Sequence, residues 1–570
     1  MGDSVPTGMA DAPAVAPAPP PPVPKQAVVV IHGMGEQKPL DTLRSFVEAV
    51  YQHDPGQRGS DPQAEADDPE LGEVNRVWIV PDDATGSAEL RRITTPKNAN
   101  GVRTDFFEFY WADIMEGTAL DQVYAWVEHL LLRSPFALPP HAKIRLAWVA
   151  LWVVTLIFVL ASVFVAKPDL FGAWSKAPLD WIAAHAAGVG LMLIGLGALW
   201  LVWRFARGLP PAQVKVVVPA ALILVGLVVA GLGANLANAQ LWAAALAIVI
   251  AMILNTFIGP YAGDIARYVR AAPQTVEKRA AIRDRGLKLL EALHGNGDAP
   301  PYDRIIVVAH SLGCMIGYDL IQLYWEKHGP THKQPGQPSA ALKAALEDVD
   351  RYVQQVWHDP GGPLTGDTSV FELAAYQAAQ ARLFDELAAS GNWRISDFVT
   401  MGNPLAHAEF LLFDDDEALA RAFEERLLAA SPPRPDRPSR SMLYYEGWDG
   451  DKTQRRGPFA HFAAAFAAVR WTNICDDNAF PAIGDVISGE VTGYFGPGVA
   501  EHGVKLGWPH LPPGLRRLIT HTLYWTWPSA QRWPPPRHIE LLREAIGLTN
   551  NVARNVARRR SRARGQQDVR

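Results

Sequence analysis

Cysteine is scarce in this sequence, with only Cys314 and Cys475 among 570 residues. Two cysteines in apolar segments exclude a disulfide framework and a cysteine-based metal cluster, and they predict buried free thiols in a reducing compartment. An excess of positive charge is absent too, because 53 Lys and Arg stand against 59 Asp and Glu, a formal net charge of −6. We therefore expect no metal site and no nucleic-acid partner.

Charged residues are also missing from four hydrophobic segments in the middle of the chain. Each is close to the ~20 residues that a membrane-spanning helix needs. Tryptophans gather toward the segment ends, as at a membrane interface, and several glycines would allow close helix packing. Buried core helices rarely run this long without a polar face, so we expect four transmembrane helices at about 146–166, 182–203, 216–234 and 241–259.

The loops around these segments predict their orientation. Basic residues precede the first segment, lie between the second and third, and follow the fourth, whereas the other two loops carry no basic surplus. The positive-inside rule then places both termini and both polar halves of the chain in the cytoplasm. The sequence therefore predicts an integral membrane protein whose two polar halves lie on the cytoplasmic side.

Both ends of the chain are biased in composition. Residues 1–25 are rich in Pro and Ala and lack the basic and apolar regions of a signal peptide, which predicts a disordered segment. Residues 549–570 are strongly basic. They would form either a solvated tail or a contact with anionic lipid headgroups.

The two polar halves alternate short apolar runs with helical patterns. Residues 27–31 and 304–309 are apolar runs typical of strands buried on both faces, and further strands are expected near 78, 106, 397, 444 and 471. Helices are expected at about 273–293 and 312–327, with helical and polar stretches in an insertion at 331–390. This alternation predicts an α/β fold around a mostly parallel sheet.

Ser311 lies at a sharp junction between an expected strand and an expected helix. Ala309 and Gly313 stand two positions before and after it, which suits a tight turn that exposes a nucleophile above a helix N-terminus. A second glycine-rich turn, HGMG at 32–35, follows the first strand. Backbone N–H groups from such a turn can face a developing oxyanion, with His32, Gly33 and Gly35 as its supporting residues.

A serine nucleophile needs a base and an acid that orients the base. His521 follows an apolar segment near the C-terminus, and His502, His510 and His538 compete with it. Asp476, Asp477 and Asp485 are the acid candidates, because all three follow the strand expected near 471. The residues alone leave the choice among them open.

The motifs occur in an order that resembles α/β-hydrolase-fold serine hydrolases of the lipase, esterase and thioesterase type, in a bacterial membrane-embedded branch. They are HGMGEQ at 32–37, YWAD at 110–113, HSLG at 310–313, GNP at 402–404, WTN with a later GD within 471–485, and HTLYW at 521–525. The resemblance implies Ser311 as nucleophile, Asp485 as acid and His521 as base. It also implies that the backbone N–H groups of Met34 and Leu312 form the oxyanion hole, and that no cofactor is needed.

The expected activity is hydrolysis of a lipophilic carboxylic ester at the bilayer, by a catalytic domain on the cytoplasmic side of a bacterial inner membrane. An acyl-protein or acyl-CoA thioesterase would use the same triad, and a transporter or scaffold with an inactive hydrolase module is the alternative from another class. The expected organisation is a disordered segment at 1–25, a first hydrolase part at 26–143, four transmembrane helices at 144–262, a second hydrolase part at 263–548, and a basic tail at 549–570.

Overall fold

The computed structural model describes most of the two polar halves and part of the segment between them. The described residues are 23–33, 38–57, 74–87, 89–115, 131–133, 142–166, 273–295, 301–330, 339–357, 370–390, 393–413, 415–435, 443–448, 455–477, 484–485, 487–508, 516–517, 520–527 and 534–567, with single positions at 192, 195, 226, 268 and 453.

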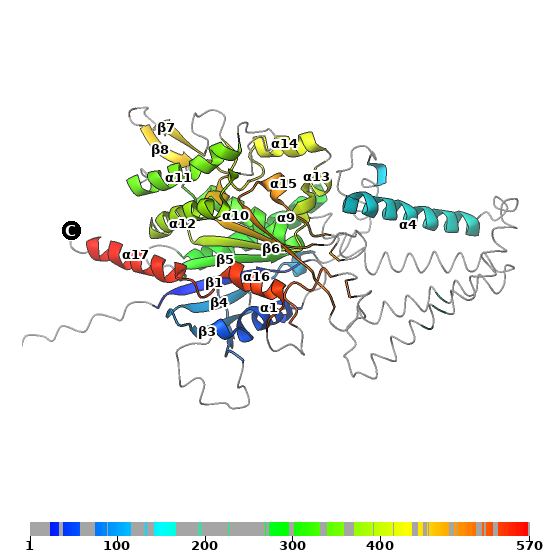
Figure 1. Ribbon diagram of the computed structural model, residues 1–570, viewed down its shortest axis with the longest axis horizontal. Coiled ribbons are helices and arrows are strands. Elements are labelled where there is room, and N and C mark those ends of the chain that lie inside the picture. The colour runs from blue at the N-terminus through cyan, green and yellow to red at the C-terminus, as the bar shows by residue number, and fades with distance from the viewer. Residues whose placement is uncertain are drawn as a thin grey trace, which may run out of the picture.

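An eight-stranded sheet is the centre of the domain, in the order β10-β9-β6-β5-β1-β4-β3-β2 (Figure 1). Neighbouring strands from β10 to β4 are all parallel, whereas β3 and β2 are antiparallel to their neighbours. The strands are β1 Lys25–Ile31, β2 Trp78–Pro81, β3 Arg91–Lys97, β4 Arg103–Phe109, β5 Arg304–His310, β6 Ile395–Met401, β9 Arg470–Asp476 and β10 Val499–Val504, and a separate hairpin pairs β7 Tyr444–Trp448 with β8 Arg455–Ala460.

Helices cover both faces of the sheet, as an α/β fold requires. The longer ones are α4 Ala142–Ala166, α9 Pro273–His294, α10 Leu312–His328, α11 Ala340–Val356, α12 Leu373–Ser390, α16 Arg537–Ile546 and α17 Val552–Gln567. The shorter ones are α1 Asp41–Val47, α13 Ala408–Leu411, α14 Asp416–Glu424 and α15 Thr492–Phe495, with single turns at Glu48–Gln52, Pro55–Gln57, Ala112–Met115, Pro404–His407 and Ala465–Ala467.

Alternate side chains of the central strands pack into two separate hydrophobic cores, one on each face of the sheet. Val29 and Val307 belong to the core beneath α9, α10 and α12, whereas Val28 and Val308 belong to the core beneath α1 and α16. Side chains alternate between the faces of a strand, so a strand buried on both faces must be apolar throughout. This confirms the prediction of a mostly parallel α/β sheet, and the structure places β1 and β5 at its centre.

The structure does not show the membrane region predicted from the sequence. Among the residues that the structure describes, no helix is long and apolar enough to cross a membrane. The first predicted span falls within α4, and the other three lie outside the described residues except for positions 192, 195 and 226. The inserted region therefore stays a prediction.

The basic C-terminal segment is a docked helix and not a free tail. In α17, Arg559 forms ion pairs with Asp385 and Glu386 of α12, and Arg560 pairs with Asp303 at the start of β5. Figure 1 shows α17 and α4 at opposite ends of the domain. Part of the basic charge is thus neutralised within the protein, which weakens the expectation that this segment binds lipid headgroups.

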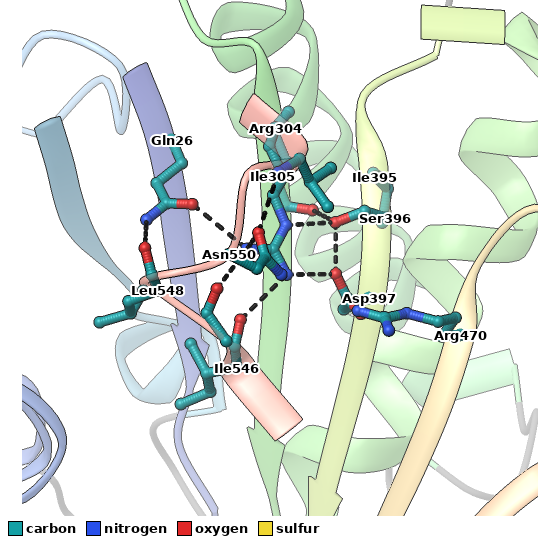
Figure 2. Close-up of polar contacts among 12 residues, drawn as sticks. Gln26, Arg304, Ile305, Ile395, Ser396, Asp397, Arg470, Ile546, Leu548 and Asn550 are labelled. Carbon is teal, nitrogen blue, oxygen red and sulfur yellow. Dashed lines mark hydrogen bonds and ion pairs between the residues drawn. The ribbon is translucent and has the colours of Figure 1, made fainter. Parts of the chain in front are cut away.

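A buried polar cluster anchors the amino ends of the strands (Figure 2). Arg304 is fully buried and donates to Asp397 Oδ2 at 2.6 Å, to Gln26 Oε1 at 3.2 Å and to Asn550 Oδ1 at 3.2 Å. Arg470 donates to the other oxygen of Asp397. Burial alone would raise the pKa of Asp397, but the two guanidinium groups hold it below its usual value. The cluster fastens the turn between α16 and α17 to the end of the sheet opposite Ser311.

Candidate active site

Ser311 occupies the turn between β5 and α10 with a strained backbone. Its φ of 55° and ψ of −132° lie in a region that residues other than glycine rarely adopt. The Ser311 backbone N–H donates to the carbonyl oxygen of Met401 at 3.0 Å, which fixes the turn against the end of β6. A parallel sheet therefore presents this serine at the carboxyl edge of its central strand, where α/β proteins place their sites.

Small residues around the turn are required by close contacts. A Cβ on Gly313 would lie 2.5 Å from the Ile31 carbonyl oxygen, which is closer than atoms can approach. A Cβ on Gly317 would lie 3.5 Å from Ala309 Cβ and 2.9 Å from the Phe398 ring. The small residues at 309, 313 and 317 therefore let α10 lie directly on β1, β5 and β6.

The turn after β1 passes beside the serine. A Cβ on Gly33 would lie 2.8 Å from Ser311 Cβ and 3.4 Å from Ser311 Oγ, so only glycine fits there. His32 stacks on Trp111 and holds the turn, with Nδ1 donating to the Gly33 carbonyl at 2.8 Å and the His32 carbonyl accepting from the Trp111 indole at 3.1 Å. Burial lowers the pKa of His32 to about 4, so this imidazole is a neutral structural group.

The structure describes only one of the two predicted oxyanion donors. Leu312 is the first residue of α10, so its backbone N–H has no acceptor within the helix and is available to a ligand at the turn. Met34 and Gly35 lie outside the described residues.

Asp485 and His521 are brought together from segments 36 residues apart. His521 Nδ1 donates to Asp485 Oδ2 at 2.9 Å, and the Tyr524 hydroxyl donates to the same oxygen at 2.8 Å. The backbone N–H groups of Ile487 and Ser488 donate to Asp485 Oδ1 at 3.0 and 3.3 Å. Burial alone would raise the pKa of Asp485, but His521 and the hydrogen bond from Tyr524 lower it to about 2. The carboxylate is charged and keeps the proton of His521 on Nδ1, which leaves a lone pair on Nε2.

The other two acid candidates occupy different positions. Asp476 is fully buried behind Asp485, accepts the Asp485 backbone N–H at 3.2 Å and the Thr520 hydroxyl at 2.6 Å, and pairs with Arg517 at 3.3 Å. Asp477 is exposed. Asp476 thus links the loop of the acid to the loop of the base, whereas Asp485 contacts the imidazole.

Gly402, from the GNP motif after β6, supports this pair from below. It has a φ of +57°, and a Cβ there would lie 2.9 Å from His521 Cε1 and 3.1 Å from Asp485 Oδ2. Both its left-handed backbone and its lack of a side chain are therefore needed where it lies. The sequence shows the motif, but only the fold reveals its role and the hydrogen bond from Tyr524.

The Ser311 hydroxyl and the second nitrogen of His521 have no hydrogen bond among the described residues. Ser311 Oγ and His521 Nε2 are both buried and unpartnered. Hydrogen bonds between a nucleophile and its base are often long or misaligned before substrate binds. The lack of a hydrogen bond at these two atoms is therefore compatible with a joint role in one reaction. A serine at a strained turn and an imidazole oriented by a buried carboxylate can together carry out nucleophilic acyl transfer.

No known family model, curated protein or solved structure matches the chain.

Proposed function

We propose that this protein is a serine hydrolase that cleaves a lipophilic carboxylic ester through Ser311, His521 and Asp485. The observation that carries the proposal is the hydrogen-bonded Asp485–His521 pair, whose imidazole contacts His310, the chain neighbour of a serine in a positive-φ turn between strand and helix. The three residues also follow β5, β9 and β10 in the chain order of α/β hydrolases.

In the proposed reaction, Ser311 Oγ attacks the acyl carbon while His521 Nε2 takes its proton. The negative charge on the carbonyl oxygen is stabilised by the Leu312 N–H at the start of α10 and by N–H groups of the turn after β1. His521 then protonates the leaving alcohol, and water activated by the same imidazole releases the acid from the acyl-enzyme. Asp485 holds the tautomer and stabilises the imidazolium throughout.

The membrane location is part of the proposal and rests on the sequence. The four charge-free segments support it, and large apolar side chains on α4 are exposed in the structure, among them Leu156 at 53% and Val153 at 48%. A site held near a bilayer would favour lipophilic esters. Reporter fusions at positions 176 and 238 are expected to lie outside the cytoplasm, and fusions at 209 and at the C-terminus inside. A C-terminal fusion outside would contradict the proposed orientation.

The activity is tested by a hydrolysis panel on the full chain in detergent micelles. Esters and thioesters of increasing acyl length are compared for wild type, Ser311→Ala and the control Ser561→Ala, which alters a serine on the surface of α17. We expect ester hydrolysis by wild type and the control, and at least ~10³-fold less by Ser311→Ala. Faster turnover of matched thioesters would assign the protein to the thioesterases, and hydrolysis that survives in Ser311→Ala would refute the proposed site.

A further inference from the structure

His310, the last residue of β5, lies between the proposed nucleophile and the loop of the proposed base. Its Nε2 lies 2.7 Å from the His521 carbonyl oxygen, and its ring centroid lies 4.7 Å from that of His521. Burial lowers the pKa of His310 to about 3, so the ring is neutral and has a single N–H. Because a carbonyl oxygen can only accept, this N–H must be on Nε2.

The loop around His521 has no regular secondary structure, and the contacts that hold it include the hydrogen bonds from Thr520 to Asp476 and from Tyr524 to Asp485. Residues 520–527 form a chain of turns and belong to no strand or described helix. The bond between His310 and the His521 carbonyl joins this loop to β5, the strand that ends directly before Ser311. Trp525, four residues further along the loop, packs edge-on against the His310 ring at 4.9 Å.

The opposite side of the imidazole faces the turn after β1. A Cβ on Gly33 would lie 3.1 Å from His310 Nδ1, so the backbone of this turn passes close to the Nδ1 edge of the ring. The ring therefore separates the base loop from the turn expected to hold the oxyanion, and both are placed relative to one rigid side chain.

We propose that His310 is a positioning residue that fixes His521 relative to Ser311 through a hydrogen bond to the His521 backbone. The inference rests on the proposed hydrolase function. A neutral donor suits this place, because a permanent positive charge beside His521 would oppose the imidazolium that forms during the reaction. The His310 side chain acts through His521 and takes no proton from Ser311.

The test compares His310→Phe, which keeps an aromatic ring without the N–H, with His310→Gln, whose amide nitrogen can take the place of Nε2. The kcat and KM for an ester and the rate of labelling by a fluorophosphonate are measured on the full chain, with thermal melts. We expect about a 10- to 100-fold lower kcat and labelling rate for His310→Phe, with KM within about twofold. His310→Gln is expected to recover activity to within about fivefold of wild type.

The activities of the two variants can overturn the inference about His310. A His310→Phe protein as active as wild type, or equal losses in both variants with unchanged melts, would overturn the inference. If His310→Phe does not fold, His310→Asn replaces it, because its amide is one methylene too short. Equal activity of the Asn and Gln variants would then overturn the inference, and a further loss in Asn would support it. If wild type itself is neither labelled nor active, the proposed function fails, whatever His310 does.

Discussion

Replacing Asp485 by asparagine tests the acid assignment most sharply, and the structure predicts how the new amide would orient. Two backbone N–H groups, from Ile487 and Ser488, point at Oδ1. The amide oxygen of asparagine must stay there, since an NH₂ group would face two donors. The NH₂ group would then point at His521 Nδ1, where the carboxylate oxygen now accepts at 2.9 Å.

An NH₂ group in that position can only donate, so His521 Nδ1 must become an acceptor. The imidazole proton would move to Nε2, and the base would lose the lone pair that takes the serine proton. Asparagine substitution of a triad aspartate lowers turnover by about 10⁴-fold in the best-studied case, equal to about 5.5 kcal/mol of transition-state stabilisation. We expect a 10³- to 10⁴-fold loss for Asp485→Asn, with normal folding.

The assay measures kcat/KM for a soluble ester and the rate of fluorophosphonate labelling, with thermal melts as the folding check. Asp477→Asn is the matched control and is expected to stay within about twofold of wild type, because Asp477 is exposed. Asp476→Asn is expected to lose activity less severely than Asp485→Asn and to melt earlier, since Asp476 holds the acid and base loops together. Near-wild-type turnover of Asp485→Asn beside an inactive Asp476→Asn would refute the reasoning.

Three further predictions follow from the same contacts. Gly402→Ala places a Cβ 2.9 Å from His521 Cε1 at a φ of +57°, so turnover should fall by at least about tenfold; unchanged kcat would show that the site relaxes around the methyl group. Asp397→Asn leaves its buried arginine partner uncompensated and should lower the free energy of unfolding by about 3–5 kcal/mol in a denaturant titration, and a loss below about 1 kcal/mol would contradict a structural role for the cluster. Burial lowers the pKa of His310 to about 3 and of His32 to about 4, so neither titrates between pH 5 and 9. The logarithm of kcat/KM should therefore rise with pH with a limiting slope of one. A limiting slope of two would mean that a second group in the site titrates.

The centre of the fold was predictable because its strands are apolar on both faces. The runs that form β1 and β5 are apolar at every position, which is typical of strands buried on both faces. The small residues around Ser311 indicate the sharp turn. The outer strands β3 and β10 were not predicted. Their sequences, RRITTPK and VAEHGV, mix polar and apolar residues, and they become strands by pairing with β4 and β9.

The contacts between residues of the site were harder to predict from the sequence. Three aspartates follow β9, and which of them reaches His521 depends on the path of the loop between Asp477 and Gly484. The structure shows Asp485 in contact with the imidazole and Asp476 behind it, a distinction that spacing cannot make. The contact between His310 and the His521 carbonyl joins residues 211 positions apart, so only the packing of the base loop against β5 reveals it.

The central claim is that Ser311 is a nucleophile activated by its surroundings, and the most direct test is the mass of the protein after reaction with a fluorophosphonate. Wild type is expected to gain one phosphonyl group, which peptide mapping locates on Ser311, while Ser311→Ala gains none. A stoichiometric adduct on Ser311→Ala, or on any other residue of wild type, would contradict the account.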